Sequence, residues 1–468
     1  MAARGACQHN ELLLECSPWA EEAGFERPDA AKRLAAAIKA GRNPLATAGK
    51  SAKAIEKLSR EAAARLAPSF PGPLLLPKDA LNWEPNYPAQ SFRSWSRQAE
   101  RNKITPDRKT LYVVASPTIT SEVDFMNGWE QPAVACTEGR RELETPSANA
   151  IVEYLSAFYH GLPVKFFPHE LRFVPWTGTS RRTKSANNHA SASLANTKTA
   201  ISQAHIGFAC NDYCARIRTR ETPDKKFIRQ LNLGDILHAA TEMLPDDAYT
   251  IALLMDFDMF EDPDDDFCCG RALGAGSRVC VVSSARYSPA LDEESIDHEH
   301  MWPTSHCKKF ADRLCAVEDL EPQKHIKSVY ETPDSPLRRA VQAAKTVPTL
   351  PTVKALNGLW FSRVVRTLVH EVGHCFAIDH CVYYACNMQG TSCIAEDLRQ
   401  PPYLCPVCLE KVTYAIACEL QQRDRAGKEA YVEERYRAIA KFCEAWKHVG
   451  LFAGYGAWVQ ARLQQLTS

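Results

Sequence analysis

Residues 369–388 determine how the rest of the chain is interpreted, and they read V-H-E-V-G-H-C-F-A-I-D-H-C-V-Y-Y-A-C-N-M. His370 and His374 are four residues apart, so on an α-helix both imidazoles lie on one face, where they can share a metal ion. Glu371 lies beside them, in a position to act on water held by the metal without being a ligand itself. His380 follows six residues after His374, which lets the chain leave the helix and return a third imidazole. Three protein ligands with a fourth position open are typical of a catalytic zinc site.

The alternative to a metal site is a surface helix whose histidine and glutamate side chains are solvated and have no common role. The H-E-x-x-H pattern alone also occurs on such helices. Here a third histidine follows at a fixed spacing, and Met388 comes eight residues after it. This larger pattern favours a zinc site over a solvated helix face.

The stretch resembles the metzincin signature, H-E-x-x-H-x-x-G-x-x-H followed by a methionine turn. More narrowly, it is similar to the archaemetzincins, in which a cysteine directly follows the third histidine and a second cysteine comes five residues later. This chain has Cys381, Cys386 and Met388, and then the sequence C-P-V-C at 405–408. It departs from the signature at Ala377, which stands where the motif has glycine. Glycine tolerates positive φ at the end of a helix, whereas alanine there is strained by about 1 kcal/mol.

The resemblance, which we place over residues 69 to the C-terminus except 172–205 and 288–352, implies a zinc metallopeptidase acting on peptides or small proteins, with aminopeptidase-like action among its expected activities. His370, His374 and His380 would hold the catalytic zinc, and Glu371 would be the general base and acid. Met388 would form an apolar floor beneath the ligands, which is physically close to the role of an ordinary core methionine.

The fold that the resemblance implies is α/β (α+β) and metzincin-like. It would have a mixed twisted sheet, an active-site helix and a smaller Cys-rich, helical C-terminal subdomain. In metzincins an edge strand above the cleft binds extended substrate by strand addition. Gly270, Arg271 and Ala272 are our candidates for this strand, and an ordinary inner strand or loop is the alternative.

Four cysteines provide a second metal-binding pattern. A C-x-x-C pair directs both sulfurs toward one point, and a second pair can join it from the loop after His380. These residues are Cys381, Cys386, Cys405 and Cys408. Four thiolates leave no open position, so this zinc would be structural, and the chain would hold two zinc ions. The alternative is a set of buried free thiols, and Cys375 and Cys393 are rival ligands nearby.

Two other readings of the whole chain stay open. One is a catalytically weak, zinc-stabilised module with the same fold that binds peptides or proteins, which Ala377 would permit. The other is a protein in which only the thiolate site is occupied.

Composition places the chain among ordinary globular proteins. Its 56 basic and 56 acidic residues balance, so nothing indicates a nucleic-acid or membrane partner, and we expect a monomer. The N-terminal residues lack the apolar core of a secretion signal. The 18 cysteines then fit reduced thiols and metal ligands in the cytoplasm or nucleus better than a disulfide scaffold.

The pattern of apolar residues predicts three parts: a variable, partly mobile extension at 1–68, an upper catalytic part at 69–380 and a lower part at 381–468. Expected strands lie at 111–115, 164–167, 249–257, 267–273 and 277–283. Expected helices lie at 30–40, 50–66, 91–101, 146–159, 227–244, 409–421, 429–446 and 456–466. Segment 172–205 is expected to be an exposed insertion, and 288–352 a loop-rich excursion.

The central helix should begin at Asn357 as its cap. Its core-facing residues would be Val365, Val369, Val372 and Phe376.

Weaker signals lie outside the main motif. The sequences His298-Glu299-His300 and His306-Cys307 could ligate metal, but a polar loop is the interpretation we favour. Cys210 and Cys214, and the Cys268-Cys269 pair, lack a convincing set of partners.

Overall fold

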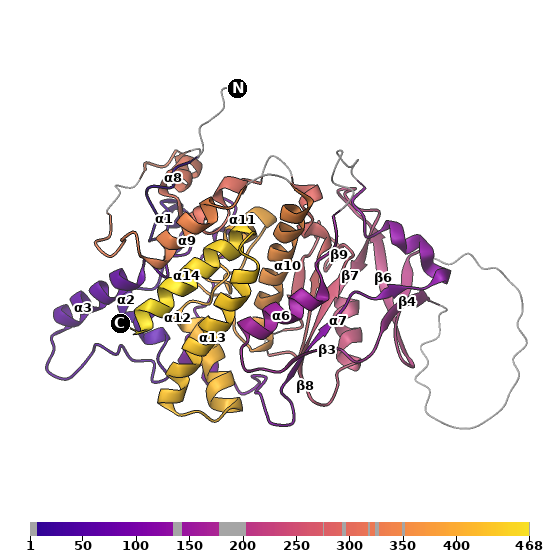
Figure 1. Ribbon diagram of the computed structural model, residues 1–468, viewed down its shortest axis with the longest axis horizontal. Coiled ribbons are helices and arrows are strands. Elements are labelled where there is room, and N and C mark those ends of the chain that lie inside the picture. Colours follow the sequence, from indigo (N-terminus) through magenta and orange to yellow (C-terminus); the bar gives the residue numbers. More distant parts are fainter. Residues whose placement is uncertain are drawn as a thin grey trace, which may run out of the picture.

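The computed structural model describes residues 7–133, 143–176, 203–274, 276–292, 296–316, 319–322, 327–348 and 352–467. Figure 1 shows a part built mainly of strands beside a part built mainly of helices. The strands are β1 (Thr110–Val114), β2 (Thr118–Ile119), β3 (Val164–Phe166), β4 (Leu171–Pro175), β5 (His205–Cys210), β6 (Tyr213–Glu221), β7 (Arg229–Asn232), β8 (Ala248–Met255), β9 (Met259–Phe260), β10 (Gly270–Ala272) and β11 (Val279–Ser283).

The α-helices are α1 (Trp19–Glu22), α2 (Ala30–Ala36), α3 (Ala52–Leu66), α4 (Ala80–Trp83), α5 (Phe92–Ser96), α6 (Ala148–Phe158), α7 (Leu233–Glu242), α8 (Lys308–Ala316), α9 (Pro336–Lys345), α10 (Val353–Cys375), α11 (Ile394–Arg399), α12 (Pro406–Thr413), α13 (Arg425–Ala445) and α14 (Gly450–Thr467). Short 3-10 helices are η1 (Ser121–Gly128), η2 (Ala285–Tyr287), η3 (Pro289–Leu291), η4 (His298–His300) and η5 (Thr304–His306), and the π-helix η6 (Tyr414–Leu420) continues α12.

A five-stranded sheet with the order β10-β11-β8-β1-β3 forms the centre of the chain. Its inner pairs are parallel, and only β10 runs antiparallel, at one edge. Every residue of β1, β8 and β11 is buried. A sheet covered on both faces has strands that are apolar throughout, which explains why these runs were recognisable in the sequence. The mixed α/β class that we predicted is confirmed.

Alternate side chains of these strands enter two different cores. In β1, Leu111 and Val113 pack in the core formed with α6, α10, α13 and α14. Tyr112 and Val114 point to the other face, where they pack with α7 and the second sheet. Figure 1 shows α10 between the strands and the C-terminal helices, so the central helix is held from both sides.

A second sheet, which the sequence did not predict, has the order β2-β4-β5-β6-β7-β9. The expected insertion at 172–205 is wrong at its start, because residues 171–175 are β4; residues 177–202 lie outside the described ranges. Strand β6 alternates charged and small residues and is only partly buried, so it lacks the apolar run of a central strand.

Two further expectations are wrong in part. The expected helix at 227–244 begins only at Leu233, because Asn232 caps it by accepting from Asp235 N–H, and the residues before it form β7. The described residues of segment 288–352 are mostly loops and short turns, as expected, but they also include the helices α8 and α9. These helices were missed because charged residues cover most of their surface and the apolar face is narrow. In α9 this face includes Leu337 and Val341, which are buried.

Helix α10 begins earlier than expected. Thr352, and not Asn357, is its cap and accepts a hydrogen bond from Ala355 N–H at 3.2 Å. Asn357 lies inside the helix and accepts from the Glu144 N–H at 3.2 Å. The expected core-facing residues Val365, Val369, Val372 and Phe376 are all buried.

The end of α10 has left-handed backbone geometry. Ala377 has φ of +60°, and its N–H donates to the His374 carbonyl at 2.8 Å. The Gln90 side chain donates to the Ala377 carbonyl at 2.9 Å, and the Trp95 indole donates to the Phe376 carbonyl at 2.8 Å. The expected strain at Ala377 is therefore present, and neighbouring side chains hold the turn in place.

Among the helices of the described residues, none combines the length and the apolar character needed to cross a membrane.

We expect Ala377→Gly to stabilise the protein. Glycine adopts φ of +60° without a Cβ clash, so the free energy of unfolding should rise by about 0.5–1 kcal/mol despite the greater flexibility of unfolded glycine. Urea unfolding at a fixed metal concentration would measure the change. The control is Ala440→Gly inside α13, which should lower the same quantity by about 1 kcal/mol. A loss at Ala377 equal to that at Ala440 would contradict the argument from strain.

Candidate metal centre

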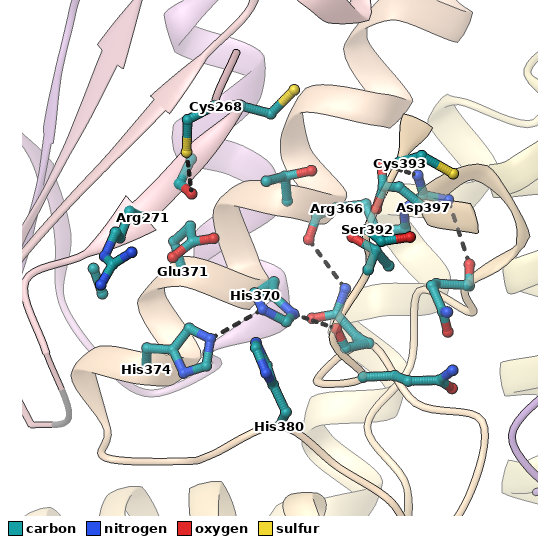
Figure 2. Close-up of a pocket in the computed structure, with 18 of the residues that line it drawn as sticks. Cys268, Arg271, Arg366, His370, Glu371, His374, His380, Ser392, Cys393 and Asp397 are labelled. Atoms are coloured by element: carbon teal, nitrogen blue, oxygen red, sulfur yellow. Dashed lines mark hydrogen bonds and ion pairs between the residues drawn. The ribbon is translucent and has the colours of Figure 1, made fainter. Parts of the chain in front are cut away.

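Helix α10 and the turn after it bring three imidazoles together. The ligand-competent nitrogens of His370, His374 and His380 all lie within 4.8 Å of one another. Figure 2 shows the three rings directed toward one another, with Glu371 next to them. The left-handed turn at Ala377 reverses the chain, so that His380 returns beside the face that carries the other two histidines.

Backbone carbonyls fix the orientation of two of these rings. The Nδ1 atom of His370 donates to the Asn387 carbonyl at 2.7 Å, and Nδ1 of His374 donates to the Ile378 carbonyl at 2.8 Å. A neutral imidazole that donates from Nδ1 carries a lone pair on Nε2. Such outer hydrogen bonds orient the histidine ligands of metal ions in many proteins.

The free Nε2 atoms face each other. Those of His370 and His374 are 3.0 Å apart. Two lone pairs at this distance repel unless a cation lies between them, and about 3.3 Å is expected between two nitrogens on a tetrahedral zinc ion. Burial lowers the pKa of all three imidazoles, with that of His380 falling to about 4. The cluster is thus composed of neutral imidazoles, the form that binds metal, and its residues fit zinc.

Glu371 lies in the same cavity of about 550 Å³. Burial raises the pKa of its carboxyl to about 8, and the backbone of Ala272 and the charge of Arg271 act in the opposite direction. A divalent cation beside it would favour the carboxylate and lower this pKa. The group is therefore placed to exchange a proton near neutral pH.

Strand β10 borders the cavity. Gly270, Arg271 and Ala272 pair with β11 on one side only, at the end of the sheet, and all three line the cavity. A Cβ at Gly270 would lie 3.3 Å from Cγ of Glu371, so the strand passes close over this side chain. On the second edge of β10, the Gly270 carbonyl accepts from the Cys268 thiol at 3.5 Å and the Ala272 carbonyl accepts from the Gly274 N–H at 2.8 Å.

Met388 lies beneath the histidines and is fully buried. A Cβ on Gly373 would stand 2.4 Å from its sulfur, so Met388 packs directly against α10 between the two histidine ligand positions. The Cys381 N–H donates to the Met388 carbonyl at 2.7 Å. This contact ties the turn containing Met388 to the segment that carries His380.

The four predicted cysteines also converge. The sulfurs of Cys381, Cys386, Cys405 and Cys408 are buried and lie within 4.8 Å of one another. The sulfurs of Cys381 and Cys405 are 3.5 Å apart, close to the value of about 3.8 Å for two thiolates on tetrahedral zinc. Hydrogen bonds from the other three thiols hold the pKa of Cys381 well below its usual range.

The two rival cysteines lie elsewhere. Cys375 is buried in the main core, and Cys393 is exposed at the start of α11. Neither belongs to a cluster of potential ligands among the described residues.

Several residues that support the site were missed in the sequence. The Asn387 side chain donates to the Arg366 carbonyl at 3.0 Å, and Arg366 donates to Asp397 at 2.7 Å. Through the carbonyl of Asn387 this network orients His370. The position of Asn387, directly before Met388, was the available signal, but a role carried by a backbone carbonyl leaves no mark in residue type.

Comparison with known proteins gives matches over this same region. The model of peptidase family M54 matches residues 351–414. The chain is 23% identical to archaemetzincin-2 of Macaca fascicularis over 357 residues, which are 76% of this chain and 73% of that protein. It is 28% identical to archaemetzincin-2 of Homo sapiens over 197 residues, 42% of this chain and 45% of that protein.

A solved structure, the archaemetzincin of Methanopyrus kandleri, shares 15% identity and a TM-score of 0.31 over 67% of this chain and 98% of its own. The sequence matches confirm the resemblance inferred from the histidine and cysteine pattern. The chain is therefore similar to the archaemetzincins, and the region that carries its histidine and cysteine pattern matches the model of peptidase family M54.

Proposed function

We propose that this chain is a zinc-dependent peptidase in which His370, His374 and His380 hold the catalytic ion. The observation that carries the proposal is the 3.0 Å approach of two Nε2 atoms whose partner Nδ1 atoms are already bound to carbonyls. Without a cation this arrangement is repulsive, so its presence favours a metal ligand set. The match to a peptidase family over the same residues supports this assignment.

A zinc ion bound here would supply Lewis-acid chemistry, polarising a peptide carbonyl and acidifying water. Glu371 is the group of this chain that would move protons. As a carboxylate it takes a proton from the attacking water, and as the acid it then gives that proton to the leaving amine. Its side chain is buried against β10 and lines the cavity that the three histidines also line.

The substrate would bind as an added strand along β10. An extended peptide that passes over Glu371 would pair with the outer edge of Gly270, Arg271 and Ala272, replacing the bonds that Cys268 and Gly274 make to this edge. This favours peptides or unfolded segments of small proteins. Aminopeptidase-like action stays a prediction, and comparing peptides with free and acetylated N-termini would distinguish it from internal cleavage.

A second zinc ion would occupy the four-thiol cluster. With Cys381, Cys386, Cys405 and Cys408 as ligands no position is left for substrate, so this ion would be structural. It would join the segment after His380 to the start of α12, and its binding energy would be folding energy.

Substituting Glu371→Gln tests the catalytic assignment. Cleavage of a mixed peptide library by purified, zinc-loaded protein should fall about 10²-fold or more, because glutamine cannot move the proton. Metal analysis should show an unchanged zinc content. The matched control is Glu410→Gln, another carboxyl whose pKa is raised by burial but which lies outside the cavity, and it should leave the rate unchanged.

Undiminished cleavage by the Glu371→Gln protein would refute the assignment. A wild-type protein that binds zinc and peptides but cleaves none would instead support the alternative, a binding module with the same fold. Ala377, strained at the turn before His380, is the feature that favours this alternative.

The two metal clusters should differ in their effect on stability. We expect the double substitution Cys405→Ser, Cys408→Ser to remove one zinc ion and to lower the melting temperature by roughly 10 °C, at about 10 kcal/mol for a structural zinc ion and about 1 °C per kcal/mol for a chain of this length. His374→Ala should also remove one zinc ion but change the melting temperature much less, because the catalytic site faces a solvent-filled cavity. Calorimetry with parallel metal analysis measures both quantities.

Cys443→Ser provides the control for the thiol cluster. Cys443 is equally buried but lies outside the clusters of potential ligands. A loss at Cys443 as large as that of the double variant would show that the four thiols have no special role.

A further inference from the structure

Two segments that are almost 300 residues apart in the sequence meet beside α8 and α9 (Figure 1). A β-bridge pairs Leu12 with Cys307, and the Leu13 N–H donates to the His306 carbonyl at 2.7 Å. The sequence predicts that the first segment belongs to a partly mobile extension and the second to a polar loop. Their pairing brings side chains from both segments into contact.

Helix α9 fixes the N-terminal segment just before this bridge. Arg338 donates from Nη1 to the His9 carbonyl at 2.8 Å and from Nη2 to the Asn10 carbonyl at 3.0 Å. Lys345 donates to the Gln8 carbonyl at 3.2 Å. These bonds hold His9 at a left-handed φ of +48°, so its side chain is directed by the fold rather than free to rotate with a loose end.

Four ligand-type side chains converge where the segments meet. One potential ligand atom from each of Cys7, His9, His300 and Cys307 lies within 4.8 Å of the others. The exposed fractions are 4% for His9, 3% for His300 and 1% for Cys307, so the cluster is closed to solvent on most sides. None of the four residues belongs to the histidine cluster of α10 or to the four-thiol cluster.

Hydrogen bonding does not account for the two imidazoles. Within the described residues, Nε2 of His300 and both ring nitrogens of His9 are buried without a hydrogen bond of ordinary geometry. A neutral imidazole always carries one N–H and one lone pair, and leaving them unsatisfied in a buried site costs about 1–3 kcal/mol. The other nitrogen of His300, Nδ1, interacts with Asp297 at 2.9 Å. A carboxylate on one ring nitrogen, with the thiols of Cys7 and Cys307 beside the ring, is typical of a histidine that ligates metal.

The two sulfurs are spaced for a shared ion. Those of Cys7 and Cys307 are 3.6 Å apart, close to the value of about 3.8 Å for two thiolates on tetrahedral zinc. A disulfide would require about 2.05 Å. The ring of His300 stacks on Phe310 with 4.2 Å between centroids, which limits its rotation away from the sulfurs.

We propose that Cys7, His9, His300 and Cys307 form a third zinc site, separate from the two described above. Two thiolates and two imidazoles are a donor set that selects zinc over calcium or magnesium, which prefer oxygen ligands. Four protein ligands complete a tetrahedron, so the ion is structural. It fastens the N-terminal segment to the loop before α8, and the protein holds three zinc ions rather than two.

The experiment measures zinc per chain in the full-length protein, purified with a reductant, loaded with zinc sulfate and desalted. The variants are Cys7→Ser and His9→Gln, which each remove one ligand near the chain end. The matched control is Cys16→Ser, in the same N-terminal segment but outside the clusters of potential ligands among the described residues. Circular dichroism verifies that each protein is folded.

The expected result is three zinc ions in the wild type and in Cys16→Ser, and two in Cys7→Ser and in His9→Gln. Refilling metal-free protein with cobalt(II) gives a second readout. The spectrum of the wild type minus that of Cys7→Ser should contain thiolate charge-transfer bands and the visible bands of tetrahedral cobalt.

Equal zinc content in all four proteins would overturn the proposal, as would a Cys7–Cys307 disulfide found by mass spectrometry in the zinc-loaded protein. The result is independent of the peptidase proposal. In a His374→Ala background every zinc count falls by one if the catalytic site binds zinc, but the difference of one between the wild-type and Cys7→Ser chains remains.

Discussion

The reversal of the chain after His374 is the constraint on which the candidate active site depends. Only a sharp turn allows His380, six residues on, to return to the face of α10 that carries His370 and His374. The turn is formed at Ala377, in a backbone conformation that an L-residue adopts at a cost of about 1–2 kcal/mol. Contacts with the surrounding structure must offset this cost.

The bracing comes from segments remote in the sequence. The Gln90 side chain binds both sides of the turn, donating to the Ala377 carbonyl and accepting from the Asp379 N–H at 3.0 Å. Gln90 is held in turn by the buried ammonium of Lys411, from α12, at 2.6 Å. Helix α12 thus supports the turn before the third histidine through Gln90. This explains physically why the thiol cluster, which fixes the start of α12, would matter for the geometry of the catalytic site.

The parts of the structure that could be predicted are those whose signal is local. The helical spacing of His370 and His374, the buried apolar strands β1, β8 and β11, and the paired cysteines all follow from residues close in sequence. The second sheet could not be found in this way. Its strand β6 is half exposed and mostly polar, and it is stabilised by pairing with β5 and β7 rather than by its own apolar content.

The same reasoning explains the Asn357 error and the missed third cluster. Asn357 and Thr352 are both good cap residues, and which one begins the helix depends on tertiary contacts such as the one between Asn357 and Glu144. His300 and Cys307 were visible as candidate ligands, but their partners lie in a segment whose composition suggested a mobile extension. No local spacing rule connects residues 7–9 with residues 300–307.

The three clusters also differ in how much folding each requires before it can form. The histidine and thiol clusters each join residues fewer than 30 positions apart, so the chain entropy lost in closing them is modest. The cluster of Cys7, His9, His300 and Cys307 closes a loop of about 300 residues, which costs only a few kcal/mol more because that cost grows logarithmically with length. Its geometry depends on distant elements, since α8 and α9 and the bonds from Arg338 to the N-terminal backbone hold its ligands in place. Zinc binding at this cluster would therefore require the folded tertiary structure, whereas the ligands of the other two clusters are close in sequence and need less of the fold.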